Sequence, residues 1–313
     1  MSLQSSAVRI VGRWPLVYSA GADPTQDRPP RVRAGSGLAW VVDKLAVVQD
    51  DALWLALVDP HTLQVDVLPL PAPDGVRLFG PDRGNKASKP DFEAAVALPD
   101  GRLLLVGSGA TAARMRWFIM DAPFVQIVDT SALYAAMLQL SGCVSAELNL
   151  EGATVHQGRL WLAQRSNGLA MGNAPRADAL AHVDLAPTLA WLAGTGPLPD
   201  VTLDRTLDLG ELCGVRLTLT DLCSAHGKLW FLAAAEASPN SYDDGEVVGS
   251  ALGWLAEDAH AVWPIVDERG AVAPLKCEGL AADRTDERHF WAVVDADDPE
   301  QPCQLLRLRL EVS

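Results

Sequence analysis

Four acidic residues and one serine stand at the head of five short phrases that recur along the chain. The phrases read SGLA, EAAV, EGAT, DLCS and EGLA, and they begin at Ser36, Glu93, Glu151, Asp221 and Glu278. Their starts are 57, 58, 70 and 57 residues apart, and the count from the last phrase through the C-terminus and on to the first is 71. Acids make up 40 of the 313 residues, so chance would place fewer than one acid in five positions. Such regular spacing indicates a repeat whose leading residues share one place in each unit.

Carboxylates brought together around one axis would attract a cation, because four of them cannot all stay ionised without compensation. The oxygen ligands are hard, and no histidine or cysteine shares the five positions, which favours Ca²⁺ with Mg²⁺ as the alternative. In this interpretation Glu93 and Glu151 also accept protons as catalytic residues. The alternative is that the acids are protonated or paired with neighbouring Lys and Arg side chains, with water filling the space around the shared axis. The predicted metal ligands are Ser36, Glu93, Glu151, Asp221 and Glu278.

Basic and polar residues gather in the segments that enter or leave the repeated strands. Against a net charge of −15, a group of cations beside a metal would attract a small anion, and such groups are typical of phosphate sites. For each single residue, a solvated surface position is the alternative. The predicted substrate-binding residues are Lys86, Lys89, Arg114, Arg165, Asn167, Tyr242 and Lys276.

Each phrase is followed by a polar turn and a short apolar run, such as Arg159-Leu-Trp-Leu-Ala, which predicts two strands joined by a turn. Radial repetition of such units predicts an all-β fold, a five-bladed β-propeller with four-stranded blades, with six blades as the alternative. The last repeat supplies three strands, and residues 7–18 form a strand before the first repeat. We therefore expect the N-terminal strand to complete the last blade and close one domain over residues 1–313.

Two segments between the strands have helical character. Thr130 opens a stretch whose apolar residues are three and four positions apart, which predicts a short helix. Residues 184–194 also have some helical character, but we expect them to supply the third strand of the third blade.

Composition excludes several classes of protein. The acidic balance disfavours a nucleic-acid partner. The N-terminus lacks a basic and then apolar leader, and no apolar stretch approaches about 18 residues, so we expect neither secretion nor membrane insertion. Five cysteines at irregular spacing, with no CxxC pair, disfavour zinc and a disulfide framework. A cytoplasmic monomer is the expectation.

Several longer phrases carry a resemblance to a known group. They are Lys89-Pro-Asp-Phe-Glu-Ala, Asn149-Leu-Glu-Gly-Ala, Gln164-Arg-Ser-Asn-Gly, Ala235-Glu through Tyr242-Asp-Asp-Gly, Lys276-Cys-Glu-Gly-Leu and Asp295-Ala-Asp-Asp-Pro. Over nearly the whole chain, these phrases resemble an uncharacterised bacterial β-propeller family related to the esterase-like phytase group, and that family brings no established activity.

A weaker, architectural similarity is to the calcium-activated nucleotidases, or apyrases. The resemblance implies a five-bladed propeller with Ca²⁺ on its axis, held by Glu and Ser side chains from successive inner strands. Asp221 departs from that pattern, whereas four of the leading residues fit it, namely Ser36, Glu93, Glu151 and Glu278.

Two functions of different classes remain open. The first is a metal-dependent hydrolase acting on a phosphate ester or anhydride, with carboxylic ester or lactone hydrolysis as a near variant. The second is a non-catalytic propeller in which the ion is structural and the rim binds a small anion or a protein.

Overall fold

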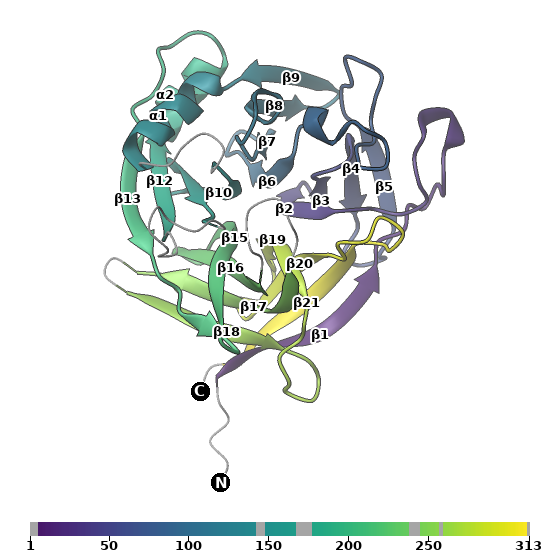
Figure 1. Ribbon diagram of the computed structural model, residues 1–313, viewed down its shortest axis with the longest axis vertical. Coiled ribbons are helices and arrows are strands. Elements are labelled where there is room, and N and C mark those ends of the chain that lie inside the picture. The colour runs from purple at the N-terminus through teal and green to yellow at the C-terminus, as the bar shows by residue number, and fades with distance from the viewer. Residues whose placement is uncertain (1–5, 142–147, 167–176, 238–244, 257–258, 312–313) are drawn as a thin grey trace.

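The computed structural model describes residues 6–141, 148–166, 177–237, 245–256 and 259–311. Within these ranges the chain forms three four-stranded sheets and one nine-stranded sheet. The sheets stand radially around a common centre, with the first strand of each repeat innermost (Figure 1). This is the β-propeller architecture that the repeat predicts.

The three four-stranded sheets are antiparallel meanders, so the order of their strands in space is the order in the chain. Each starts with the strand that carries a repeated phrase. The first sheet contains β2 (Gly35–Val41), β3 (Lys44–Gln49), β4 (Trp54–Val58) and β5 (Val65–Pro69). The second contains β6 (Phe92–Ala97), β7 (Leu103–Gly107), β8 (Arg116–Asp121) and β9 (Phe124–Asp129). The third contains β10 (Leu150–His156), β11 (Arg159–Gln164), β12 (Asp178–Asp184) and β13 (Thr202–Leu207).

The nine-stranded sheet joins two meanders along their outer strands. Its spatial order is β14-β15-β16-β17-β18-β1-β21-β20-β19. The bounds are β14 (Glu211–Leu212), β15 (Val215–Ala225), β16 (Lys228–Ala237), β17 (Glu246–Leu255), β18 (His260–Val266), β19 (Lys276–Ala282), β20 (His289–Asp295), β21 (Gln304–Glu311) and β1 (Ala7–Pro15).

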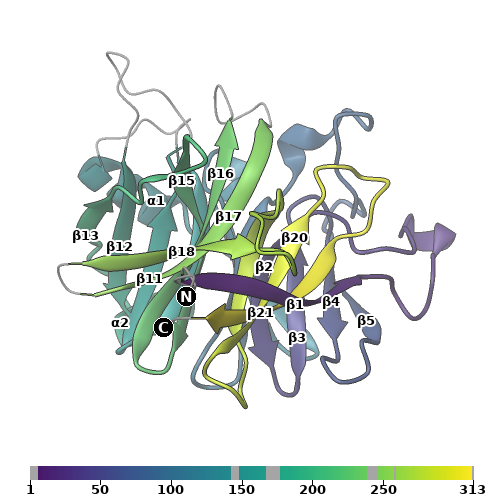
Figure 2. The same ribbon diagram turned by 90° about the horizontal axis from the view of Figure 1, so that it is seen from below.

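The N-terminal strand β1 makes the junction within this sheet. It pairs antiparallel with β21, which confirms the expected pairing of the first strand with the last repeat. It also pairs parallel with β18 at Val8↔Ile265 and Arg9↔Val266, so β1 lies between the two (Figure 2). The Arg9 guanidinium strengthens this junction by donating to the carbonyl oxygens of Asp267 and Glu268, each at 3.0 Å. The contact with β18 was not predicted, and it merges two repeats into one sheet.

Two α-helices lie beside the third sheet (Figure 1). Helix α1 (Ser131–Ser141) confirms the helix predicted after Thr130, and α2 (Leu185–Leu192) follows β12 directly. The prediction that 184–194 forms a strand is wrong, because Leu185, Leu189 and Leu192 recur at helical spacing. In the described residues, neither these helices nor any other is long and apolar enough to cross a membrane.

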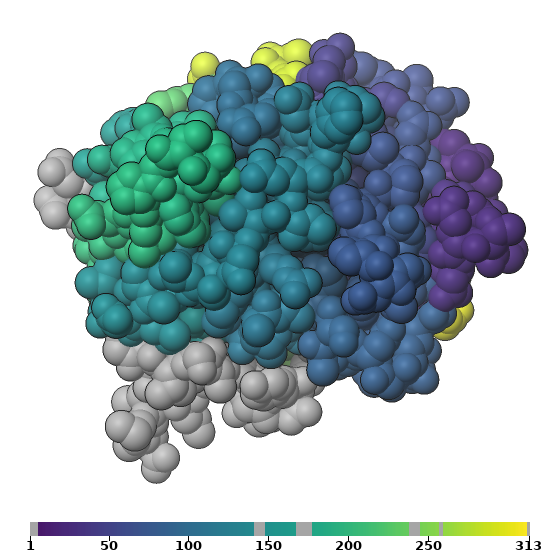
Figure 3. Space-filling view, turned by 90° about the horizontal axis from the view of Figure 1, so that it is seen from above, coloured from purple at the N-terminus to yellow at the C-terminus, as the bar shows by residue number. Residues whose placement is uncertain are grey.

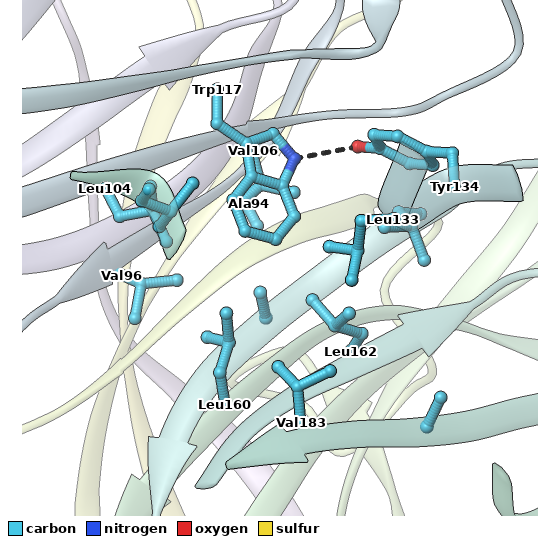
Figure 4. Packing of buried hydrophobic residues seen from close by; sticks show 14 of the residues in the cluster. Ala94, Val96, Leu104, Val106, Trp117, Leu133, Tyr134, Leu160, Leu162 and Val183 are labelled. Atoms are coloured by element: carbon cyan, nitrogen blue, oxygen red, sulfur yellow. Dashed lines mark hydrogen bonds between the residues drawn. The ribbon is translucent and has the colours of Figure 1, made fainter. Parts of the chain in front are cut away.

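Apolar clusters fill the joints between neighbouring repeats. In the joint between the second and third sheets, Trp117 and Leu104 pack against Leu160 and Leu162, and Tyr134 of α1 closes one side (Figure 4). The Trp117 indole N–H donates to the Tyr134 hydroxyl at 2.9 Å, so the polar atoms of this core are paired. At the surface the blue and teal residues of these two sheets abut (Figure 3). Each repeat therefore buries its faces against its neighbours.

The innermost strands form a closed ring of contacts. Within the described residues, β2 packs against β6, β6 against β10, β10 against β15, β15 against β19 and β19 against β2. The approach is close enough to require glycine. A Cβ on Gly152 would lie 2.7 Å from Asp221 Cα, and a Cβ on Gly279 would lie 2.8 Å from Leu38 N. This explains why glycine recurs as the second residue of the repeated phrase.

Substitution of Gly152 by alanine should therefore destabilise the ring. The new methyl group would meet the backbone of β15, which cannot move without shifting a neighbouring repeat, and we expect a loss of about 1–3 kcal/mol. Urea denaturation of the variant measures it. Gly196→Ala is the matched control, because its Cβ would meet nothing closer than the Ala190 methyl group at 3.1 Å. Equal midpoints for the two variants would contradict the close packing of the inner strands.

Candidate functional site

A β-bulge interrupts each of the five inner strands, near the N-terminal end of β2, β6, β10 and β19 and in the middle of the longer β15. The pairing of each inner strand with its neighbour skips one residue, and a bulge leaves that residue outside the ladder and re-aims its side chain. The skipped residues, taken from the described strands, are Ser36, Glu93, Glu151, Thr220 and Glu278. Four of these lead the repeated phrases identified in the sequence.

The fourth position holds Thr220, so the prediction that Asp221 occupies it is wrong. The register shift lies between Leu219 and Asp221, which puts Asp221 at the place that glycine takes in β10. The presence of an acid at 221 favoured the incorrect alignment. The distance to the next strand would have given the correct alignment. Lys228 lies eight positions after Thr220, just as Lys44 lies eight positions after Ser36.

The two hydroxyl residues of the set bind backbone. Thr220 Oγ1 donates to the carbonyl oxygen of Cys277 at 2.7 Å, and Ser36 Oγ donates to that of Phe92. Each acceptor immediately precedes the bulge glutamate of the next repeat. Asp221, which is 1% exposed, also binds backbone, since its two oxygens accept from the amides of Leu222 and Leu280, each at 2.7 Å. Ser36 and Asp221 thus connect neighbouring repeats.

The three bulge glutamates line one cavity of about 320 Å³. Burial raises the pKa of all three, and the charge of Glu151 raises the pKa of Glu93 and of Glu278 further, so the carboxylates lie within electrostatic reach of one another. The described residues that line the cavity include eleven acids and six bases, a formal surplus of five negative charges. The acids are Asp50, Asp51, Asp82, Asp91, Glu93, Glu151, Glu236, Glu278, Asp295, Asp297 and Asp298, and the bases are Arg33, Lys86, Lys89, Arg114, Arg165 and Lys276.

Protein cations compensate two of the three glutamates. Arg165 Nη1 lies 3.4 Å from Glu151 Oε1, while its Nη2 donates to Glu236 at 2.9 Å. Lys276 Nζ lies 3.0 Å from Glu278 and 3.9 Å from Glu236. The charges therefore alternate from Glu151 to Glu278 across three repeats. For these two glutamates the alternative of pairing with Lys and Arg describes the structure.

Glu93 belongs to a different group. One oxygen each from Asp50, Asp91 and Glu93 lie within 4.8 Å of one another. Lys89 Nζ is 2.5 Å from both Asp50 and Asp91, and Arg114 Nη1 is 2.7 Å from Asp91. Asp50 Oδ1 is buried and has no hydrogen-bond partner among the described residues.

Asp50 and Asp91 were missed in the sequence because they do not lead a phrase. Two signals were available for them. Asp91 precedes Glu93 by two residues, and Asp50 directly follows β3, the strand paired with β2.

The electrostatics of the cavity wall reflect its excess of acid. Burial, followed by Asp91, Glu151 and Asp50, raises the pKa of Glu93 well above its usual value. Burial, with Asp50 and Asp297 adding to it, raises the pKa of Asp295 to about 7. Although burial alone would lower it, the pKa of Lys89 is raised by Asp50, Asp91 and Glu93. The lysine therefore stays charged.

The predicted substrate-binding residues fall into three sets. Lys89, Arg114, Arg165 and Lys276 line the cavity, each paired with a carboxylate. Lys86 lines it too, and within the described part of the chain this exposed side chain makes no ion pair. Asn167 and Tyr242 lie outside the described residues.

The group of Asp50, Asp91 and Glu93 fits a divalent cation. Its donors are hard carboxylate oxygens at a separation that one ion can bridge. The buried oxygen of Asp50 lacks a partner, and the surplus of acids persists after every cavity cation is counted. The cations present in the protein therefore do not satisfy the site.

Comparison with known proteins gives a family and several distant structures. The model of a family described as a family of unknown function, DUF6929, matches residues 31–310. The calcium-binding protein regucalcin from Agrobacterium tumefaciens is 11% identical, with 97% of each chain covered and a TM-score of 0.46. The PQQ-bound aldose sugar dehydrogenase from Streptomyces coelicolor is 12% identical, with 98% of each chain covered and a TM-score of 0.46. A putative gluconolactonase is 9% identical, with 99% of this chain and 93% of that chain covered and a TM-score of 0.43.

Proposed function

Because the chain belongs to DUF6929, a family of unknown function, we propose its function from the site. It is a metal-dependent, hydrolase-like propeller that binds Ca²⁺, with Mg²⁺ as the alternative, and acts on a small anionic molecule in the central cavity. The observation that carries this proposal is the convergence of Asp50, Asp91 and Glu93, with an unpartnered buried oxygen on Asp50.

The proposal includes five blades in one domain. The nine-stranded sheet counts as two blades, β15 to β18 and β19 to β21 with β1, that share an edge. The five bulges support this count, since each marks one inner strand. With Thr220 in the fourth place, the set reads Ser, Glu, Glu, Thr, Glu. This mixture of hydroxyls and carboxylates supports the resemblance to the calcium-activated nucleotidases better than the set with Asp221.

The cation would be held by Glu93, Asp50 and Asp91. When bound, it would supply Lewis acidity toward a phosphoryl or carbonyl oxygen of the substrate. An arrangement on the axis, with Glu93, Glu151 and Glu278 as ligands, is the competing placement. Glu93 is common to both, whereas Asp50 and Glu278 distinguish them.

The substrate would be an anion that binds only together with the cation. Because acids outnumber bases by five in its lining, the cavity offers a free anion no net positive charge, so a phosphate group needs the divalent charge beside it. Lys86 supplies a cation at the mouth that is free of ion pairs with described residues. Phosphate esters and anhydrides are the first class to test, following the resemblance to the phytase group, and lactones and carboxylic esters the second.

The side chains of the protein would position the substrate and accept a proton during its hydrolysis. Glu151 is the proposed proton acceptor, because it lines the cavity and burial raises its pKa above the usual value. Its Oε1 accepts from the Asn149 amide and from Arg165, which fixes the carboxylate against the wall. Arg165 and Lys276 add positive charge there, where negative charge on a phosphoryl group would grow.

A second candidate function is a non-catalytic propeller with a structural ion and a binding rim. One observation favours it. Arg165 donates to Glu151, Glu236 and Thr218, so its guanidinium is already committed within the protein. Cations committed in this way stabilise a fold without touching a substrate.

Titration calorimetry with CaCl₂ on chelator-treated protein tests the ion. We expect Glu93→Gln and Asp50→Asn each to weaken Ca²⁺ binding about tenfold or more, because a carboxylate ligand is lost, while Glu278→Gln leaves it within about twofold. Asp200→Asn, at an exposed position, is the control. If Glu278→Gln lost Ca²⁺ binding and Asp50→Asn retained it, the result would favour the placement of the ion on the axis. A wild-type protein that binds neither Ca²⁺ nor Mg²⁺ would refute the metal.

Turnover separates the two candidate functions. A panel of phosphate monoesters, phosphoanhydrides, lactones and carboxylic esters should show hydrolysis that chelation abolishes and that Glu151→Gln reduces. Ca²⁺ binding without turnover of any class would favour the non-catalytic propeller.

A further inference from the structure

Lys89 occupies the position where the proposed cation would bind. Its side chain is 11% exposed, and its Nζ lies 2.5 Å from Asp50 Oδ2 and 2.5 Å from Asp91 Oδ1. These are two of the three carboxylates that approach within 4.8 Å of one another. The ammonium group and a divalent ion would therefore compete for these two carboxylates.

With every carboxylate counted as ionised, the formal charges of this group balance with a divalent ion and not with the lysine. The three carboxylates face two protein cations, Lys89 and Arg114, which leaves a formal charge of −1. Replacing the ammonium by a divalent ion, with Arg114 kept on Asp91, brings the total to zero. Adding the ion beside Lys89 would instead leave one positive charge in a buried site, which is costly.

Lysine is suited to leave this position. Its ammonium is a compact charge on a flexible four-carbon stem. The guanidinium of arginine is planar, and its several donors have fixed directions, so it is held by several acceptors at once. Lys89 lines the cavity that also holds the mouth residue Lys86. A released Lys89 side chain therefore has space in this cavity, where its ammonium would supply the positive charge that a bound anion requires.

We propose that Lys89 is an exchangeable counter-ion. Without a divalent cation it pairs with Asp50 and Asp91, and when the cation binds it moves into the cavity and contacts the anionic substrate. This inference rests on the proposed function and adds its regulation. Cation and anion then bind cooperatively, because the first frees a positive group for the second.

The other cavity cations do not share this property. Arg165 is held by three acceptors in the protein. Lys276 pairs with Glu278 at 3.0 Å and Asp297 at 3.4 Å, outside the group of Asp50, Asp91 and Glu93. Both should stay in place when the ion binds, which makes Lys276 an internal reference.

Lysine acylation of the wild-type protein tests the exchange without a mutation. The chain has five lysines, Lys44, Lys86, Lys89, Lys228 and Lys276. Limited treatment with an acetylating reagent, read by mass spectrometry, should modify Lys89 at least about threefold faster with saturating CaCl₂ than with chelator, while the rate at Lys276 stays unchanged. An equal or slower rate at Lys89, in a protein that binds Ca²⁺ by calorimetry, would overturn the exchange and leave the metal site standing.

Lys89→Met provides the second measurement. Without its competitor, the site should bind Ca²⁺ about tenfold more tightly. The Ca²⁺-loaded variant should bind inorganic phosphate, kept below the precipitation limit, several-fold more weakly than the loaded wild type. Lys44→Met, which removes a lysine paired with Asp66 on the surface, should change neither. Unchanged or weaker Ca²⁺ binding in a folded Lys89→Met overturns the exchange, whereas no Ca²⁺ binding in any protein refutes the metal site itself.

Discussion

Asp221→Ala is expected to destabilise the protein by about 3–5 kcal/mol, one of the largest effects of any single substitution in the chain. The carboxylate is 1% exposed and accepts from the backbone amides of Leu222 and Leu280, with Ala153 as a further donor. These amides belong to three neighbouring inner strands. Removing the acceptor leaves them buried and unpaired, each at a cost of about 1–3 kcal/mol.

Urea denaturation followed by circular dichroism measures this loss. Asp200→Ala, which removes an exposed carboxylate, is the control and should unfold at the wild-type midpoint. An Asp221→Ala variant of normal stability that had lost Ca²⁺ binding would contradict the structural role. It would restore the ligand role assigned to Asp221 from the sequence.

The repeat could be found in the sequence because each blade of a propeller has similar structural requirements at equivalent positions, so similar residues recur along the chain. Four of the five inner strands have glycine or alanine directly after the bulge residue, where strands approach closely, so pairs such as Glu151-Gly152 and Glu278-Gly279 recur at nearly constant spacing. The fourth copy defeats this pattern. Asp221 replaces glycine there, and its side chain accepts hydrogen bonds from an amide of its own strand and one of the neighbouring strand β19.

The charge partners could not be predicted in the same way. Glu236 comes from the second strand of one repeat, yet it contacts Arg165 of the preceding repeat and Lys276 of the following one. Such contacts depend on how adjacent sheets are staggered, and no local spacing encodes that. The net charge of the cavity could not be predicted either. In a chain rich in acids, a group of basic residues is easily noticed, whereas the acids that lie beside them are not. The expectation of a basic, anion-attracting rim therefore gives way to a cavity with a surplus of acid.

Arg165→Met should destabilise the fold by about 3–5 kcal/mol near neutral pH, because it leaves buried acids uncompensated. Arg165 is 3% exposed and contacts Glu151 at 3.4 Å and Glu236 at 2.9 Å. Methionine fills a similar volume, so the loss reflects charge more than packing. Arg159→Met is the control, since the ion pair of its guanidinium with the described residues is a 3.8 Å contact with an exposed acid, Asp184.

The pH dependence of this loss distinguishes charge from packing. In the wild type, burial alone would raise the pKa of Glu236, but Lys276 and Arg165 hold it below its usual value. Glu236 therefore contributes stability above its unfolded pKa of about 4.3, and that contribution is lost as the pH falls through the lower folded pKa. Without Arg165, burial should raise the pKa of Glu151 further above its usual value, while Lys276 still lowers that of Glu236.

The linkage of Glu151 to pH has the opposite sign to that of Glu236. A carboxyl group with a raised folded pKa destabilises at high pH, so the deficit of Arg165→Met should shrink as the pH falls from 7 toward 4.5. Denaturant midpoints of both proteins, measured with chelator across this range, give the difference. A deficit that stays constant with pH would mean that Arg165 acts by packing, and the alternating row of charges from Glu151 to Glu278 would then contribute little to holding the three repeats together.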